Sequence, residues 1–309
     1  MKYIYLIVVM FLVILTAGYL INKQSGISGD VVKNTEDLEI KGSDTLLQMV
    51  SSLAESYSEV EPSARISVTG GGSGVGIAAL INGEIDIADA SRKIEEDEIK
   101  QASNNDIDIW EFIIARDMLS VIVNEDNSIS ELTMDETGKI YRGEINNWKE
   151  FGGEDKEITL YGRQSTSGTY IFFMEHVLEG DYSAKMRNME GNQAILDAVK
   201  QDKSGIGYVG VGYLVDENGK QISGIKVIKV AKDKSSEYIS PLNKEKLSDY
   251  SISRPLYQYF ANKPVKNSAG YNFLMFELSA QGKDVIKKSG FDEITEIDSQ
   301  HNEELLEKI

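Results

Sequence analysis

Apolar and polar residues follow two different periods along most of this chain. Apolar residues at positions 46, 47, 50, 53, 54 and 57 recur at helical spacing. The segment ARISVTG, residues 64–70, alternates as a strand does. Strands that alternate with helices in this way predict an α/β fold built from βαβ units.

The same reading predicts most of the remaining elements. In chain order it gives a strand ending at Gly42, a short helix ending near Asn82-Gly83, a strand ending at 88–92, two strands within 109–124 that join near Asp117, a capped helix and a turn within 132–148, a strand at 157–162, a helix at 167–180, a helix and a strand within 191–210, and an amphipathic helix pair within 268–291.

Three predicted strands end in turns rich in Gly, Ser and Thr that open a helix, at 42–46, 70–76 and 162–169. A helix start exposes unpaired N–H groups and a partial positive charge, which suit an anion. In open α/β sheets, ligands bind at the carboxyl ends of strands. If the three turns converge, they would therefore form an anion-binding cage, although the sequence does not show whether they converge.

The N-terminus has a different character. Residues 1–21 carry one Lys and then an apolar run from Tyr3 to Ile21, about long enough to cross a bilayer as a helix. This predicts export or anchoring. A lipid-modified Cys is excluded because the chain has no Cys, and the length of the run favours an uncleaved anchor over a cleaved signal. Residues 22–35 read as a polar tether.

Composition narrows the function further. The 309 residues are 41% hydrophobic and 27% charged, as expected for a globular protein of up to two domains. A net charge of −18 argues against nucleic acid as a partner. It does not exclude a small anion, because distant charges are screened while a buried site responds to its local dipoles.

Catalysis is not expected. The two histidines are His176 and His301, and a His-rich metal site is improbable with so few. His176 would lie roughly 13 Å along a helix from Ser167, too far to activate it as a nucleophile. The loop at 74–79 fits a dinucleotide pattern only loosely, and it lacks the Lys of a P-loop. We therefore expect neither a cofactor nor a bound metal.

Six segments occur in an order that resembles a known family. They are KGSDTLLQMVSSLAESY, VTGGGSGVGIAALINGEIDIADASR, IYRGEINNWKEFGG, YGRQSTSGTYIFFMEHVL, GIGYVGVGYL and YSISRPLYQYF. Together they look like the PstS family, the extracytoplasmic phosphate receptors of ABC importers. The similarity runs from about residue 38 to about residue 291.

The resemblance implies a two-lobed periplasmic-binding-protein fold of type II that closes on phosphate at a hinged cleft. One lobe would hold residues 36–115 and 254–309, and the other residues 116–253. The implied partners are inorganic phosphate, two permease subunits with their ATPase, and the membrane through the N-terminal segment. The receptor itself is expected to be a monomer.

The resemblance also implies which residues bind phosphate. By position these are Thr45 with the backbone N–H of Leu46, Ser73, Ser91, Arg163, Ser167, Gly168 and Thr169. An arginine fork can hold two anion oxygens at once, and glycines let the backbone approach a ligand. Each residue also has an ordinary interpretation: Thr45 as a helix cap, Ser73 as part of a flexible turn, and Arg163 as a solvated loop residue.

The chain departs from the family pattern at two acids. Where the family has an aspartate that accepts the proton of hydrogen phosphate, this chain has Arg92, and Ser165 replaces a second acid. Either Arg92 or Asp89 is therefore expected to face the ligand. With Arg92 inward, the site should prefer the dianion and sulfate should compete. With Asp89 inward, sulfate should compete poorly.

Two other functions remain open from the sequence. A surface-anchored adhesion or scaffold protein would need only the anchor and an exposed face. A receptor for another tetrahedral oxyanion, such as sulfate, would use a similar set of donors. The clustering of donors in three turns favours a receptor.

Overall fold

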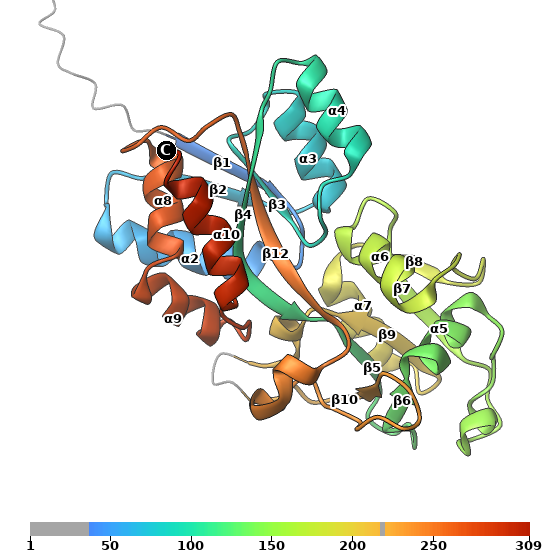
Figure 1. Cartoon of the computed structure of the whole chain (residues 1–309). Coiled ribbons are helices and arrows are strands. Elements are labelled where there is room, and N and C mark those ends of the chain that lie inside the picture. Colours follow the sequence, from blue (N-terminus) through green and yellow to red (C-terminus); the bar gives the residue numbers. More distant parts are fainter. Residues whose placement is uncertain (1–36, 217–219) are drawn as a thin grey trace, which may run out of the picture. The chain divides into compact units, whose positions relative to one another are not determined.

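The computed structural model describes residues 37–216 and 220–309 (Figure 1). The predicted anchor and tether, residues 1–21 and 22–35, lie outside the described residues. Within the described part, no helix is both long and apolar enough to cross a bilayer.

The first sheet has five strands in the order β2-β1-β3-β12-β4. The strands are β1 (Asp37–Gly42), β2 (Arg65–Thr69), β3 (Ile87–Ala90), β4 (Ile109–Met118) and β12 (Ser253–Ala261). β1 pairs in parallel with β2 and β3, while β12 runs antiparallel to β3 and β4. The parallel strands bring the carboxyl ends of β1 and β3 to one edge of the sheet, which is where their turns lie.

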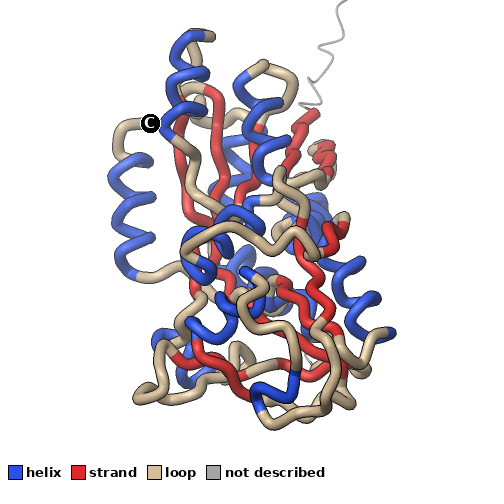
Figure 2. Tube along the Cα trace, turned by 90° about the vertical axis from the view of Figure 1, so that its right-hand side faces the viewer, coloured by secondary structure: helices blue, strands red, loops and turns tan. Residues whose placement is uncertain are grey.

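Helices cover both faces of the first sheet (Figures 1 and 2). They are α2 (Leu47–Val60), α3 (Ser73–Ile81), α4 (Glu96–Asn104), α8 (Ala269–Glu277), α9 (Ala280–Lys288) and α10 (Glu296–Leu306). α2 packs with α8 and α9, α3 packs on β1, β3, β12 and α4, and α10 packs on β4. The sequence pattern did not reveal α4 and α10, because they bury only Ala102, Asp298 and Asn302 and so have no apolar stripe.

The second sheet also has five strands, in the order β10-β5-β9-β7-β8. The strands are β5 (Ser120–Asn124), β7 (Thr159–Arg163), β8 (Arg187–Met189), β9 (Gly205–Val209) and β10 (Ile225–Val227). β7 is parallel to β8 and β9, and β5 is antiparallel to β9 and β10. A separate parallel pair joins β6 (Glu131–Thr133) to β11 (Lys229–Ala231).

The helices beside the second sheet are shorter. They are α5 (Met134–Arg142), α6 (Gly168–Phe173) and α7 (Gly191–Gln201), with a π-helix at Met174–Leu178 and 3₁₀ turns at Trp148–Phe151, Val211–Leu214 and Lys244–Asp249. The capped helix predicted within 132–148 is confirmed, with a Thr133–Glu136 capping box before α5. The single helix predicted at 167–180 is instead α6 followed by the π-helix.

Two segments connect the sheets. β4 ends at Met118 and β5 begins at Ser120, so the predicted pair of strands is confirmed, with its junction at Leu119. The chain returns to the first sheet through β12, which pairs along the whole of β4. One continuous cluster of buried apolar side chains, which runs in sequence from Leu38 to Phe291, includes residues of both sheets. The three turns at 42–46, 70–76 and 162–169 follow β1, β2 and β7 of these two sheets.

A candidate anion-binding site between two sheets

The three turns predicted to hold an anion meet in the structure. Gly72 donates its N–H to the Gly42 carbonyl at 2.8 Å, which joins the first two turns. Gly74 donates to the Thr166 carbonyl at 3.0 Å, which joins the second turn to the third. The convergence that the sequence left open is therefore found, between turns of the two different sheets.

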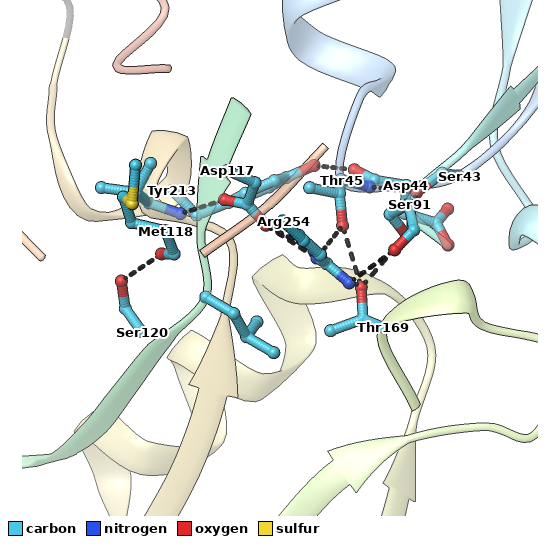
Figure 3. Close-up of polar contacts among 12 residues, drawn as sticks. Ser43, Asp44, Thr45, Ser91, Asp117, Met118, Ser120, Thr169, Tyr213 and Arg254 are labelled. Carbon is cyan, nitrogen blue, oxygen red and sulfur yellow. Dashed lines mark hydrogen bonds and ion pairs between the residues drawn. The ribbon is translucent and has the colours of Figure 1, made fainter. Parts of the chain in front are cut away.

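Five buried hydroxyl groups lie at this meeting point, and we call them the hydroxyl cluster: Ser43, Thr45, Ser73, Ser91 and Thr169. Figure 3 labels all of these except Ser73. The hydroxyl oxygens of Thr45 and Thr169 are 3.0 Å apart, and those of Ser91 and Thr169 are 3.4 Å apart. Ser43 donates to Ser91 at 2.8 Å, and the Ser73 and Ser91 oxygens are 3.4 Å apart. Turns distant in sequence thus supply one continuous group of hydrogen-bonding oxygens.

Backbone geometry explains two of the glycines at this point. A Cβ on Gly168 would lie 2.3 Å from the Ser73 hydroxyl oxygen, so a larger residue would push into the cluster. Gly72 has a φ of 100°, which L side chains rarely adopt, and a Cβ there would lie 2.6 Å from the Thr166 carbonyl oxygen. The close approach of the turns therefore depends on glycine.

The structure shows which of the hydroxyl residues at helix starts cap a helix and which do not. Thr45 does not cap α2. Leu46 occupies the N-cap position, and no side chain accepts a hydrogen bond from the first turn of this helix as a cap. Ser73 is the first residue of α3, and its hydroxyl accepts from the Ser91 N–H at 3.0 Å. Ser167 does cap α6, accepting from the N–H groups of Thr169 and Tyr170. The helix-cap interpretation therefore fails for Thr45, while Ser167 is a cap.

Arg163 lies at the end of β7 and is 1% exposed. Its guanidinium forms an ion pair with Asp44, which belongs to the turn after β1 and also accepts the Gly71 N–H at 3.0 Å. The Arg163 N–H donates to the hydroxyl of Tyr208 at 3.1 Å. The interpretation of Arg163 as a solvated loop residue is therefore wrong, because it is buried and paired with an acid of the opposite sheet.

Sequence reasoning missed a further buried arginine, besides Arg92 and Arg163. Arg254 on β12 donates from Nη2 to Thr169 Oγ1 at 3.0 Å and to Thr45 Oγ1 at 3.4 Å. Its Nε and Nη2 donate to the Asp117 carboxylate on β4, at 3.0 and 2.7 Å (Figure 3). In the sequence, Arg254 was noted only within the segment YSISRPLYQYF and as the first residue of the predicted lobe segment 254–309. An arginine within the otherwise largely apolar strand β12 was the sequence feature that could have indicated a buried charge.

Arg92 lies beside the cluster and is held by acids at the start of α4. Its Nη1 and Nη2 donate to the two carboxylate oxygens of Glu98 at 2.7 and 2.6 Å, and Glu95 lies 3.6 Å away. Burial lowers the pKa of Arg92, but the hydrogen bond and charge of Glu98 outweigh this and leave the pKa raised. The guanidinium is thus fixed by Glu98, with Nε left buried and unpartnered.

Asp89 points its carboxyl group to a different neighbour. It accepts from Gln258 Nε2 at 3.1 Å, and the same nitrogen donates to Glu277 on α8 at 3.1 Å. All three side chains are buried. Burial raises the pKa of Asp89 to about 8, opposed by the Gln258 bond, and burial together with the Asp89 charge raises the pKa of Glu277 well above its ordinary value. Asp89 therefore belongs to a buried polar group behind the cluster.

The histidines lie in other surroundings. His176 Nδ1 is 3.0 Å from the Phe172 carbonyl oxygen, and its ring stacks on Phe172 at 4.2 Å between centroids. His301 Nε2 is 3.2 Å from the Glu111 carbonyl oxygen. These contacts give His176 a packing role in the π-helix region.

Comparison with solved structures defines the class of protein. Residues 31–281 match the PBP superfamily domain. A substrate-binding protein of Clostridium perfringens, whose crystal structure contains bound phosphate, has a TM-score of 0.73 at 27% identity, covering 84% of this chain and 100% of that chain. An ABC-type phosphate transport receptor from Vibrio cholerae has a TM-score of 0.65 at 26% identity, with coverage of 84% and 100%. The fold is that of a two-lobed, type II periplasmic-binding protein.

Sequence similarity narrows this class to one family. The phosphate-binding protein PstS of Staphylococcus haemolyticus is 35% identical over 248 residues, which is 79% of this chain and 77% of that protein. The chain belongs to the PstS family of phosphate-binding proteins. The family resemblance of the six segments is thereby confirmed. These relatives are binding proteins and not enzymes, which agrees with the sequence prediction.

Proposed function

We propose that this protein is an extracytoplasmic receptor that captures inorganic phosphate and delivers it to an ABC importer. The observation that carries the proposal is the hydroxyl cluster itself, in which turns of two sheets bring buried hydroxyls within 3.4 Å of one another beside buried arginines. Hydroxyls and arginine forks are the donors that a tetrahedral oxyanion requires. Family membership supports phosphate as that anion.

The proposed ligand-binding residues follow from the family and are supported by their placement. They are Thr45, Leu46 through its N–H, Ser73, Ser91, Arg92, Arg163, Ser167, Gly168 and Thr169. The hydroxyl residues of this set and Arg163 are buried and lie in the three converging turns or directly after β3. Their hydrogen bonds to one another support a single site.

Arg92 takes a peripheral part in this proposal. Because Glu98 already binds both terminal nitrogens of Arg92, the residue contributes positive potential at the edge of the site more than direct hydrogen bonds. Arg163 also has an acid partner, Asp44, but that pair joins the two turns that carry proposed ligand-binding residues. Arg163 is therefore the arginine that we expect to contact phosphate.

The remaining parts of the receptor are proposals as well. We assign residues 36–115 and 254–309 to one lobe and residues 116–253 to the other. The two five-stranded sheets support a division into two lobes, and the proposed borders fall near the end of β4 and at the start of β12. Residues 1–21 would anchor a monomeric receptor to the membrane and residues 22–35 would tether it. The permease subunits and their ATPase would receive the phosphate from the closed receptor.

The test is isothermal titration with phosphate of a chain that begins at Asp30. We expect it to fold and to bind one phosphate, because every proposed ligand-binding residue lies after the tether. Anion analysis of the protein as purified should also reveal phosphate. A folded protein without saturable phosphate binding would contradict the receptor function, and it is the result that an adhesion or scaffold protein would give.

A further inference from the structure

Arg254 is placed where it can control the proposed ligand-binding hydroxyls. It is 1% exposed, and its partner Asp117 is 0% exposed. The two residues lie directly opposite each other on the paired strands β12 and β4. Nη1 donates to the Ser91 carbonyl at 2.9 Å, and the guanidinium carbon lies 5.1 Å from the centre of the Phe172 ring. The fork is therefore fixed on several sides.

The chemistry of these contacts determines the role of each hydroxyl. A guanidinium N–H can donate but cannot accept, so the hydroxyl oxygens of Thr45 and Thr169 must accept from Arg254. Each hydroxyl oxygen has two lone pairs and carries one proton, so Arg254 occupies one lone pair of each. One of the two hydroxyls donates to the other across 3.0 Å, and the proton of the second is left for another partner. The hydroxyls of Ser73 and Ser167 accept from backbone N–H groups in the same way. In these four hydroxyls one lone pair is thus already used, which favours donation to the ligand.

The nearby carboxylates are occupied by other donors. Asp117 accepts from Arg254 and from the Val211 N–H at 3.0 Å. Asp44 accepts from Arg163 and from Gly71. Each of these two carboxylates is therefore already paired with an arginine and with a backbone N–H.

We propose that Arg254 is a specificity-determining positioning residue: by donating to Thr45 and Thr169, it favours these hydroxyls as donors to the ligand and so makes the site favour oxyanion oxygens that carry no proton. This inference rests on the proposed function. It concerns the anion selectivity of the same site, and it attributes that selectivity to a residue on β12. A donor facing a protonated oxygen must compete with the proton of the ligand, which costs binding free energy.

The groups around Arg254 do not obscure the test. Besides Asp117, the charged or titratable groups near it are Arg163 on β7 and Tyr208 on β9. Burial raises the pKa of Tyr208 to about 12, so this hydroxyl keeps its proton between pH 6 and pH 8. Phosphate changes its protonation near this range, whereas sulfate does not. Any change of sulfate affinity between pH 6 and pH 8 therefore arises from the protein and not from the ligand.

The experiment measures the dissociation constants of phosphate and sulfate at pH 6 and pH 8 by isothermal titration of the full-length protein. The variants are Arg254→Met, which removes the fork, and Arg254→Lys, which keeps the charge. Arg116→Met is the matched control, because Arg116 lies on the neighbouring strand and forms an ion pair with Asp298 on α10. Thermal unfolding checks that each variant is folded.

We expect wild type to bind sulfate measurably and to bind phosphate several-fold more tightly at pH 8 than at pH 6. In Arg254→Met, both anions should bind more weakly, and the preference for phosphate over sulfate should rise by about tenfold, since the freed threonine oxygens can accept a proton. The pH dependence for phosphate should flatten. Arg254→Lys should lie between the two, and Arg116→Met should resemble wild type.

Equal losses for phosphate and sulfate in Arg254→Met, with an unchanged pH profile, would overturn the inference and leave Arg254 a structural residue. If Arg254→Met does not fold, an unchanged anion preference in Arg254→Lys would overturn it equally. Wild type that binds phosphate but not sulfate would also overturn the inference while leaving the receptor function intact. Wild type that binds neither anion would overturn both.

Discussion

Asp89 should make the stability of this protein fall as the pH rises from 6 to 8. Its carboxyl group is buried with Gln258 and Glu277, and burial raises its pKa from 3.8 to about 8. The folded protein therefore holds the proton more tightly than the unfolded chain does. The resulting stability is complete below the unfolded pKa and is lost as the pH rises through the folded pKa.

The magnitude follows from the two pKa values of Asp89. Since one pKa unit corresponds to about 1.4 kcal/mol, the free energy of unfolding decreases by about 6 kcal/mol in all from acid pH to above pH 8. About 2 kcal/mol of this loss falls between pH 6 and pH 8. Asp89→Asn has nearly the shape of the protonated acid and no titration, so it should lack this part of the pH dependence.

The assay is thermal or urea unfolding of wild type and Asp89→Asn at several pH values between 6 and 8, without phosphate. Subtracting the free energy of unfolding of the variant from that of wild type at each pH removes, to first order, the contributions of all other titrating groups. Glu277→Gln is the companion variant, because the pKa of Glu277 is also raised by burial and by the charge of Asp89. Parallel stability profiles for wild type and Asp89→Asn would refute the argument that Asp89 is buried as a neutral acid.

Three further predictions concern the site and its scaffold. Arg163→Ala should weaken phosphate binding by about 1.5 to 3 kcal/mol or more, because it removes a buried charged donor. The control Lys156→Ala removes a charge from an exposed ion pair and should leave the phosphate affinity nearly unchanged. Equal losses of affinity in the two variants would show that Arg163 is not part of the site. Arg92→Ala should weaken phosphate binding less than Arg163→Ala, since Glu98 already binds its fork, and a larger loss would show direct contact. Thr133→Ala should lower the free energy of unfolding by about 1 kcal/mol through loss of the α5 cap, with no change in phosphate affinity.

The local pattern of apolar and polar residues predicted much of the fold and the segments that form the site. The alternation of strands and helices predicted the α/β fold, and the three turns were found from their glycine and hydroxyl content alone. These features depend on residues within about one helical turn or one strand of each other. The helices α4 and α10 escaped the same reading because they bury few apolar side chains and so show no periodic stripe.

The partners in the site were decided by tertiary structure. Arg254 and Thr45 are separated by 209 positions, and the pairing of β12 between β3 and β4 brings them together. The sequence also could not tell whether Thr45 caps its helix, because the same residue type at a helix start serves either purpose. Its neighbours from other elements, Thr169 and Arg254, distinguish the two.

The sequence thus determined which segments can present donors, since hydroxyl and glycine content is a local property. Tertiary structure alone decided the surroundings of the charges: Arg163 meets Asp44, Arg92 meets Glu98, and Asp89 is buried beside Gln258. The physical reason is that the state of a charged side chain depends on burial and on partners within a few ångströms. Those partners lie on different strands and helices, and sheet pairing and core packing bring them into contact.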